Sequence, residues 1–71
     1  MSDAVQIYGK AGCPYTSAAV KDYESRGVRV EYFDVKQDAA AMKRLLELSG
    51  GERRVPLLVE RGRVSIGFGG T

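Results

Sequence analysis

The chain has 71 residues, with 11 Lys and Arg, 9 Asp and Glu and no His, so its net charge is +2 at pH 7. This length predicts one domain over residues 1–71 with a small core. The weak, scattered charge does not indicate nucleic-acid binding, and no apolar run has the length of a membrane span. The first residues lack the regions of a signal peptide, so we expect a cytoplasmic protein whose single cysteine stays reduced.

The first half of the chain predicts a strand, a helix and a second strand. Residues 4–8 form a short apolar run. Apolar and small side chains then recur at helical spacing on one face, which Gly27 ends; this face consists of Thr16, Ala19, Val20 and Tyr23. Residues 28–32 alternate between apolar and charged side chains, which is typical of a strand.

The second half predicts one more helix and a hairpin. Asp38 is a suitable N-cap for a helix that ends at residues 49–51. The apolar face of this helix consists of Ala41, Met42, Leu45 and Leu48. Strands at residues 57–60 and 63–67 flank Arg61-Gly62, a two-residue hairpin turn.

The predicted order β-α-β-α-β-β restricts the topology. A right-handed crossover makes the first two strands parallel, and the short turn makes the last two antiparallel. We therefore expect an α/β fold with a mixed four-stranded sheet and helices packed against it. The predicted fold has no third helix after the hairpin, so we expect the C-terminal helix to be absent.

Cys13, the single cysteine, is the strongest candidate for a reactive group. Pro14 suits the first position of a helix, which makes Cys13 the N-cap. Unpaired N–H groups and the helix dipole stabilise a thiolate there, and Lys10 adds positive charge. The structural alternative is a small buried side chain without chemistry. A loop between a strand and a helix is usually exposed, which favours the reactive interpretation.

Three segments carry a resemblance to a known family. The segment Lys10-Ala11-Gly12-Cys13-Pro14-Tyr15-Thr16 resembles the active-site loop of glutaredoxins, in which a lysine precedes a Cys-Pro-Tyr-Cys motif. Val55-Pro56 resembles the family's Thr-Val-Pro segment, whose proline is cis and faces the cysteine. Residues 66–71 are similar to its glycine-rich glutathione-binding turn. The resemblance covers nearly the whole chain and implies a thioredoxin-like fold.

The chain departs from the family at two places. Thr16 stands where the second active-site cysteine is usual, so the motif cannot form an internal disulfide. Gly69-Gly70-Thr71 replaces the usual continuation into an aspartate that binds the amino group of glutathione. The chain most closely resembles a small glutaredoxin-like (seleno)protein branch with a Cys-Pro-Tyr-Thr motif. Residues 25–27 and 67–68 also resemble the glutaredoxin-like electron donors of ribonucleotide reductase.

The resemblance implies Cys13 as the catalytic nucleophile and glutathione as its co-substrate. The implied glutathione-binding residues are Lys10, Tyr15, Arg53, Val55, Pro56, Gly69, Gly70 and Thr71. From the residues alone, Tyr15 is also consistent with a surface aromatic and Pro56 with the start of a strand. Arg53 is also consistent with a solvated loop, which is the commoner fate of such charges.

Four functions are compatible with these features. The leading one is a monothiol oxidoreductase acting on glutathione mixed disulfides or protein disulfides. The second is an electron donor that is itself reduced by a thioredoxin-reductase-like flavoprotein. The third is a dimer that binds a [2Fe–2S] cluster, which needs two chains and external thiols, because one cysteine cannot supply four ligands. The fourth is a non-catalytic adaptor.

Overall fold

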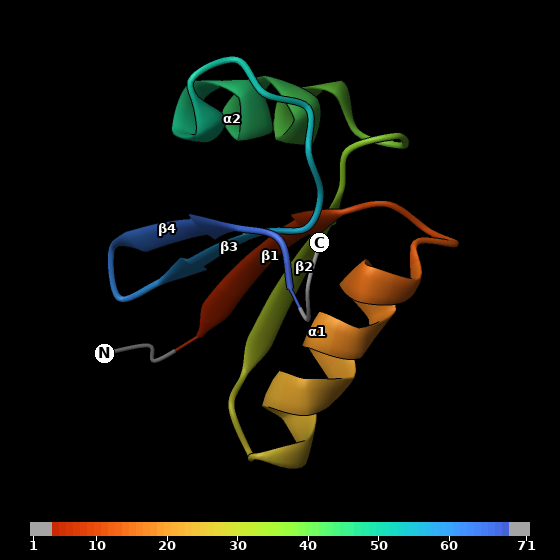
Figure 1. Ribbon diagram of the computed structural model, residues 1–71, viewed down its shortest axis with the longest axis vertical. Coiled ribbons are helices and arrows are strands. Elements are labelled where there is room, and N and C mark those ends of the chain that lie inside the picture. The colour runs from red at the N-terminus through yellow and green to blue at the C-terminus, as the bar shows by residue number, and fades with distance from the viewer. Residues whose placement is uncertain (1–3, 69–71) are drawn as a thin grey trace.

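The computed structural model describes residues 4–68 and contains the six predicted elements in the predicted order (Figure 1). They are β1 (Val5–Gly9), α1 (Pro14–Ser25), β2 (Val30–Asp34), α2 (Ala39–Ser49), β3 (Leu57–Glu60) and β4 (Arg63–Ile66). The predicted boundaries are one or two residues off at β1, β2 and β4. The largest shift has a local cause: the N–H of Val28 donates to the carbonyl of Tyr23, 3.0 Å away, and so closes the end of α1 instead of starting β2.

The four strands form one mixed sheet in the order β2-β1-β3-β4. β1 is parallel to β2 and antiparallel to β3, and β3 is antiparallel to β4. In this register Ile7 lies beside Tyr32 on one side and beside Leu58 on the other. The predicted α/β class and mixed four-stranded sheet are therefore confirmed.

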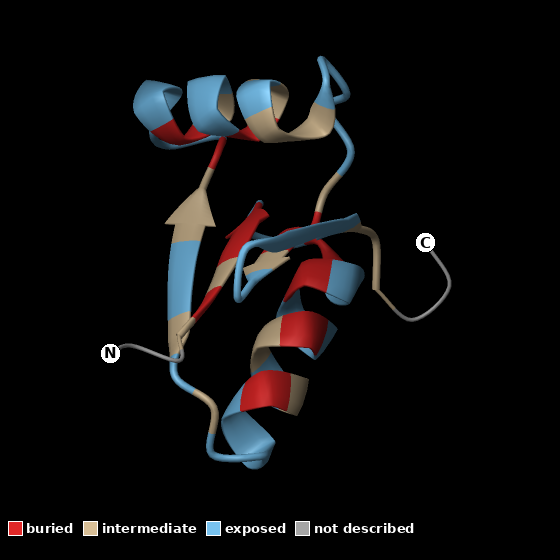
Figure 2. Ribbon diagram, turned by 90° about the vertical axis from the view of Figure 1, so that its left-hand side faces the viewer, coloured by how far each residue is buried: buried red, intermediate tan, exposed pale blue. Residues whose placement is uncertain are grey.

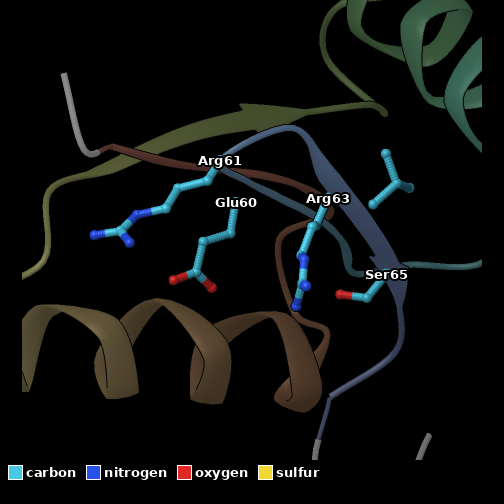
Figure 3. A pocket seen from close by; sticks show the side chains of 5 residues that line it. Glu60, Arg61, Arg63 and Ser65 are labelled. Atoms are coloured by element: carbon cyan, nitrogen blue, oxygen red, sulfur yellow. The ribbon is translucent and has the colours of Figure 1, made fainter. Parts of the chain in front are cut away.

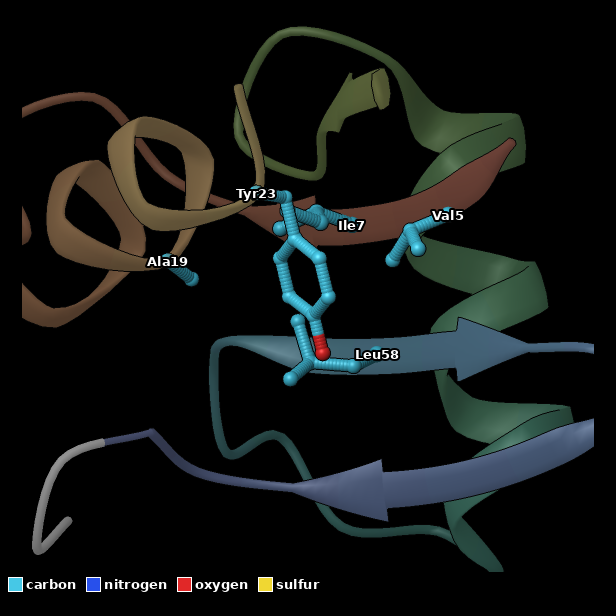
Figure 4. Close-up of a cluster of buried hydrophobic side chains, with 5 residues drawn as sticks. All are labelled: Val5, Ile7, Ala19, Tyr23 and Leu58. Carbon is cyan, nitrogen blue, oxygen red and sulfur yellow. The ribbon is translucent and has the colours of Figure 1, made fainter. Parts of the chain in front are cut away.

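The helices cover opposite faces of the sheet, α1 on one and α2 on the other (Figures 1 and 2). Side chains of β1 alternate between these faces, as a strand requires. The core on the α1 face consists of Val5, Ile7, Ala19, Tyr23 and Leu58 (Figure 4). The core on the α2 face consists of Tyr8, Val35, Ala41, Leu45 and Leu57. The central strand β1 thus contributes to both cores.

α2 begins and ends with specific caps. The Asp38 carboxylate accepts hydrogen bonds from the N–H groups of Ala40 and Ala41, at 2.9 and 3.4 Å, which confirms the predicted N-cap of α2. Gly50 ends α2 in the left-handed conformation, with φ of 72°.

The predicted β3–β4 hairpin is confirmed as well. Its turn residues Arg61 and Gly62 both have positive φ, 52° and 78°, as a type I′ turn requires.

Candidate active site around Cys13

Cys13 lies where the chain leaves β1 and enters α1. Its backbone is extended, with φ of −86° and ψ of 115°, and Pro14 is the first residue of the helix. The N–H of Cys13 donates to the carbonyl of Lys10 at 3.3 Å, which closes a tight turn through Gly12. Gly12 has φ of 82°, a conformation that favours glycine. The Cys13 carbonyl accepts from Ser17 at 3.1 Å, the first bond of the helix. Cys13 is therefore the N-cap of α1.

The Cys13 residue is only 9% exposed, so the expectation of an open loop position is wrong. The reason is the tight turn, which brings the start of α1 directly against the end of β1. Its neighbours Gly9 and Thr16 are both buried there. A substrate disulfide therefore has to fit closely against the loop to reach the thiol.

The pKa of the Cys13 thiol is lowered, mainly by the nearby hydroxyl of the Thr16 side chain. The backbone N–H groups of Thr16 and Tyr15 lower the pKa further, and burial partly opposes them. The charge of Lys10 is the smallest contribution. The thiolate is thus stabilised chiefly by the first turn of α1, and the lysine adds little.

Thr16 is the residue whose role the sequence did not reveal. It is 3% exposed, and its Oγ1 atom has no partner in hydrogen-bonding geometry among residues 4–68. The hydroxyl nevertheless lies close enough to Cys13 to be the largest influence on the thiol pKa. A hydroxyl proton rotates freely, so it can turn to a thiolate when one forms. The sequence signal for this role was the position of Thr16 three residues after the N-cap, since side chains at that position face the cap residue.

Gly9 fixes the position of Thr16. A Cβ atom on Gly9 would lie 2.6 Å from Oγ1 and 3.0 Å from Cβ of Thr16, closer than real side chains pack. Only a residue without a side chain lets the first turn of α1 approach the end of β1 this closely. Gly9 was not among the predicted site residues.

The other predicted site residues lie on two segments. Lys10 and Tyr15 flank Cys13, and Tyr15 is 43% exposed. Arg53 is exposed and Val55 half-buried on the segment before β3, while Pro56 is fully buried. The Val55–Pro56 peptide bond is cis. The predicted residues Gly69, Gly70 and Thr71 lie outside the described residues.

The end of β4 lies beside the cis-proline. The N–H of Gly67 donates to the carbonyl of Pro56 at 2.8 Å, and Ile66 pairs with Leu57. Since Leu57 pairs with Tyr8, one residue before the end of β1, this segment lies on the β3 side of the Cys13 loop. Gly67, after the end of β4, is therefore held next to Pro56.

A hollow at the tip of the β3–β4 hairpin belongs to another part of the molecule. Its lining residues are Glu60, Arg61, Arg63, Val64 and Ser65, and the side chains of Glu60 and Arg63 extend toward α1 (Figure 3). Glu60 accepts a hydrogen bond from the Tyr23 hydroxyl at 3.2 Å. The hollow lies at the opposite end of β3 from Pro56 and is not part of the candidate active site.

Residues 4–68 lack two kinds of feature. In this part of the chain no three His, Cys, Asp or Glu side chains are grouped so as to hold a metal ion. The same residues contain no helix with the length and apolar character needed to cross a membrane.

Comparison with known proteins identifies the family. Residues 5–64 match the glutaredoxin family, and the chain belongs to it. No curated protein matches the sequence with significance. The family and the fold support a thiol–disulfide oxidoreductase.

Solved structures agree with this assignment. The chain is 34% identical to the thioredoxin-like protein BC3987, with a TM-score of 0.82 over 92% of this chain and 88% of that one. A buckwheat glutaredoxin–glutathione complex is 26% identical, with a TM-score of 0.73 over 89% of this chain and 59% of that one. A glutaredoxin from Archaeoglobus fulgidus shares the fold at 20% identity, with a TM-score of 0.81 over 97% of this chain and 78% of that one. The thioredoxin-like fold is thereby confirmed.

Proposed function

We propose that the protein is a monothiol oxidoreductase that reduces glutathione mixed disulfides. The observation that carries this proposal is the single cysteine at the start of α1, with a lowered thiol pKa and with Thr16 where a second cysteine would stand. A nucleophilic thiolate without a neighbouring thiol has to be released by an external one. Glutathione is an external thiol of the right kind, and a glutaredoxin related in structure was solved in complex with it.

The reaction has two exchange steps. The Cys13 thiolate forms a bond to the glutathionyl sulfur, the disulfide breaks, and the substrate thiolate leaves with the electron pair and takes up a proton. A second glutathione thiolate then attacks the glutathionyl sulfur on Cys13. This releases glutathione disulfide and restores the Cys13 thiolate. In total, one glutathione mixed disulfide and one glutathione are converted into the substrate thiol and one glutathione disulfide.

Glutathione has candidate contacts on the β3 side of Cys13. The backbone of Val55, ahead of β3, is suited to pair with that of the tripeptide, as peptides pair with exposed strand ends. Lys10 and Arg53 are exposed cations suited to the glycine carboxylate, and Tyr15 borders the same loop. We assign the γ-glutamyl end to the backbone of Gly69 and Gly70 and to Thr71. Because the cations are exposed, each contact contributes at most about 1 kcal/mol and is weakened by salt.

A glutathione-coupled assay with a small glutathione mixed disulfide tests this function. We expect turnover by the native protein, none by Cys13→Ser, and a KM several-fold higher for Arg53→Ala. Arg29→Ala is the matched control, since Arg29 is also exposed but lies before β2. A parallel assay supplies electrons from NADPH and thioredoxin reductase. Activity in that assay alone would refute glutathione dependence and support a reductase-fed donor.

A further inference from the structure

A groove of about 520 Å³ runs beside the Cys13 loop, on the side away from Pro56. Its lining residues are Lys10, Ala11, Gly12, Thr16, Ser17, Val20, Lys21, Glu24 and Tyr32. They come from the loop, from the first three turns of α1 and from β2. The Tyr32 side chain is one of the few large apolar side chains exposed among residues 4–68, at 41%.

The sheet order places this groove on the opposite side of Cys13 from Arg53, Val55 and Pro56. Lys10, on the loop between the two surfaces, borders both. β2 lies on one side of β1 and β3 on the other. Tyr32 pairs with Ile7 from the β2 side, whereas Leu57, next to Pro56, pairs with Tyr8 from the β3 side. The groove is also within electrostatic range of the thiolate. The pKa of Tyr32 is raised by burial, by Asp34 and by the charge of Cys13.

A mixed disulfide has two halves joined at the sulfurs, and both cannot occupy the same surface. When glutathione occupies the β3 side, the other half has to lie elsewhere around the Cys13 loop. The lining of the groove is mostly apolar and includes the side chains of Val20, Ala11 and Tyr32. The lining carries two lysines, Lys21 and Lys10, against the single carboxylate of Glu24, and of the two only Lys21 is not also assigned to glutathione. These features suit a polypeptide segment with an apolar side chain near the disulfide and an acidic residue beside it.

We propose that the groove between α1 and Tyr32 binds the polypeptide half of the substrate, through an apolar side chain flanked by an acidic one. The inference rests on the proposed function and narrows its substrate class to glutathionylated proteins with such a sequence at the modified cysteine. The covalent steps are unchanged, because the groove binds the departing half and takes no part in the exchange.

Matched glutathionylated peptides test the proposal. They carry either Leu or Gly next to the modified cysteine, and either Asp or Lys one residue further on. For the native protein we expect kcat/KM about tenfold higher with Leu than with Gly, the effect of burying one apolar side chain. Tyr32→Ser should remove most of this preference, through KM rather than kcat. Lys21→Glu should reverse the preference for Asp over Lys.

Val64→Ser is the matched control. Val64 is exposed to 42%, like Tyr32, but lies on the opposite edge strand β4. The Val64→Ser variant should leave unchanged both the preference for Leu over Gly and the preference for Asp over Lys. Equal rates for all peptides, with normal turnover of a small glutathione mixed disulfide, would overturn the groove assignment and leave the proposed function standing.

Binding without turnover separates the two proposals. The unmodified Leu and Gly peptides are titrated into Cys13→Ser and followed by chemical-shift mapping. Shifts at Val20 and Tyr32 with the Leu peptide support the groove, even where glutathione turnover fails. Shifts confined to the β3 side, or none at millimolar peptide, would overturn it.

Discussion

Gly9 and Thr16 are in direct contact: a Cβ atom on Gly9 would lie 2.6 Å from the Thr16 hydroxyl oxygen. This contact joins the last residue of β1 to the first turn of α1. The Thr16 hydroxyl in turn is the largest influence that lowers the pKa of Cys13. The reactivity of the thiol therefore depends on a glycine four residues earlier in the chain.

Gly9→Ala should raise the pKa of the Cys13 thiol. The added methyl group displaces Thr16, and overpacking of this kind costs about 1–3 kcal/mol of stability. Thiolate absorbance against pH measures the first effect and urea denaturation the second. Gly27→Ala is the control: Gly27 has φ of 76° and open space around it, so alanine strains the backbone far from Cys13. That variant should lose stability without changing the thiol pKa, and a similar pKa change in both would contradict the contact.

Thr16→Val should raise the Cys13 pKa without loss of stability. Valine has the shape of threonine but cannot donate a hydrogen bond to the thiolate. The Thr16 hydroxyl is buried without an ordinary partner, so its removal relieves a desolvation cost of about 1 kcal/mol or more. Thr16→Ser keeps the hydroxyl and should keep most of the exchange activity. Thiol–disulfide exchange rates of the two variants, measured below neutral pH, test the role of the hydroxyl. Equal rates for the two variants would exclude it.

The native protein should become more stable than Cys13→Ser as the pH rises toward 9. The folded thiol has a pKa below the ordinary value of 9.0, so between these two values the unfolded chain binds more protons than the folded one. The stabilisation is fully present above the unfolded pKa and disappears as the pH falls through the folded pKa. Urea denaturation of both proteins from pH 5 to 9.5 measures the difference. A difference that does not change with pH would mean that the thiol pKa is not lowered by folding.

Asp38→Ala should destabilise the protein by about 1 kcal/mol through loss of the α2 cap. The free energy of unfolding in urea measures this loss. Asp22→Ala is the comparison, since Asp22 makes an exposed ion pair with Arg26 at 2.8 Å. Such pairs on a helix surface contribute at most about 0.5 kcal/mol. If the Asp22 variant lost as much as the Asp38 variant, the cap would not be the source of the effect.

Local patterns were sufficient to predict the elements of this fold. Helical spacing, the cap at Asp38 and the Arg61-Gly62 turn are each encoded within a few residues, and the structure contains all three. The start of β2 was predicted two residues early, because the alternation at residues 28–32 does not show that Val28 closes the preceding helix.

The surroundings of Cys13 were less predictable. Its place at the N-cap follows from Pro14, but its burial and the contact between Gly9 and Thr16 arise where β1 meets α1. The sequence identified Thr16 as the residue that replaces a second cysteine. The only sequence signal that this side chain acts on the remaining thiol was its position three residues after the N-cap. The effect itself depends on how closely the helix approaches the strand.

The central position of β1 has a consequence for local opening of the structure. β1 is hydrogen-bonded on both sides and contributes to both cores, whereas β2 and β4 are edge strands. Amide hydrogens of β1 should therefore exchange with solvent only when the whole molecule unfolds, and those of the edge strands through smaller openings. The Cys13 loop leaves directly from β1. Local opening of β2 or β4 can therefore change the shape of the binding surface on that side of the sheet, while Cys13 keeps its position.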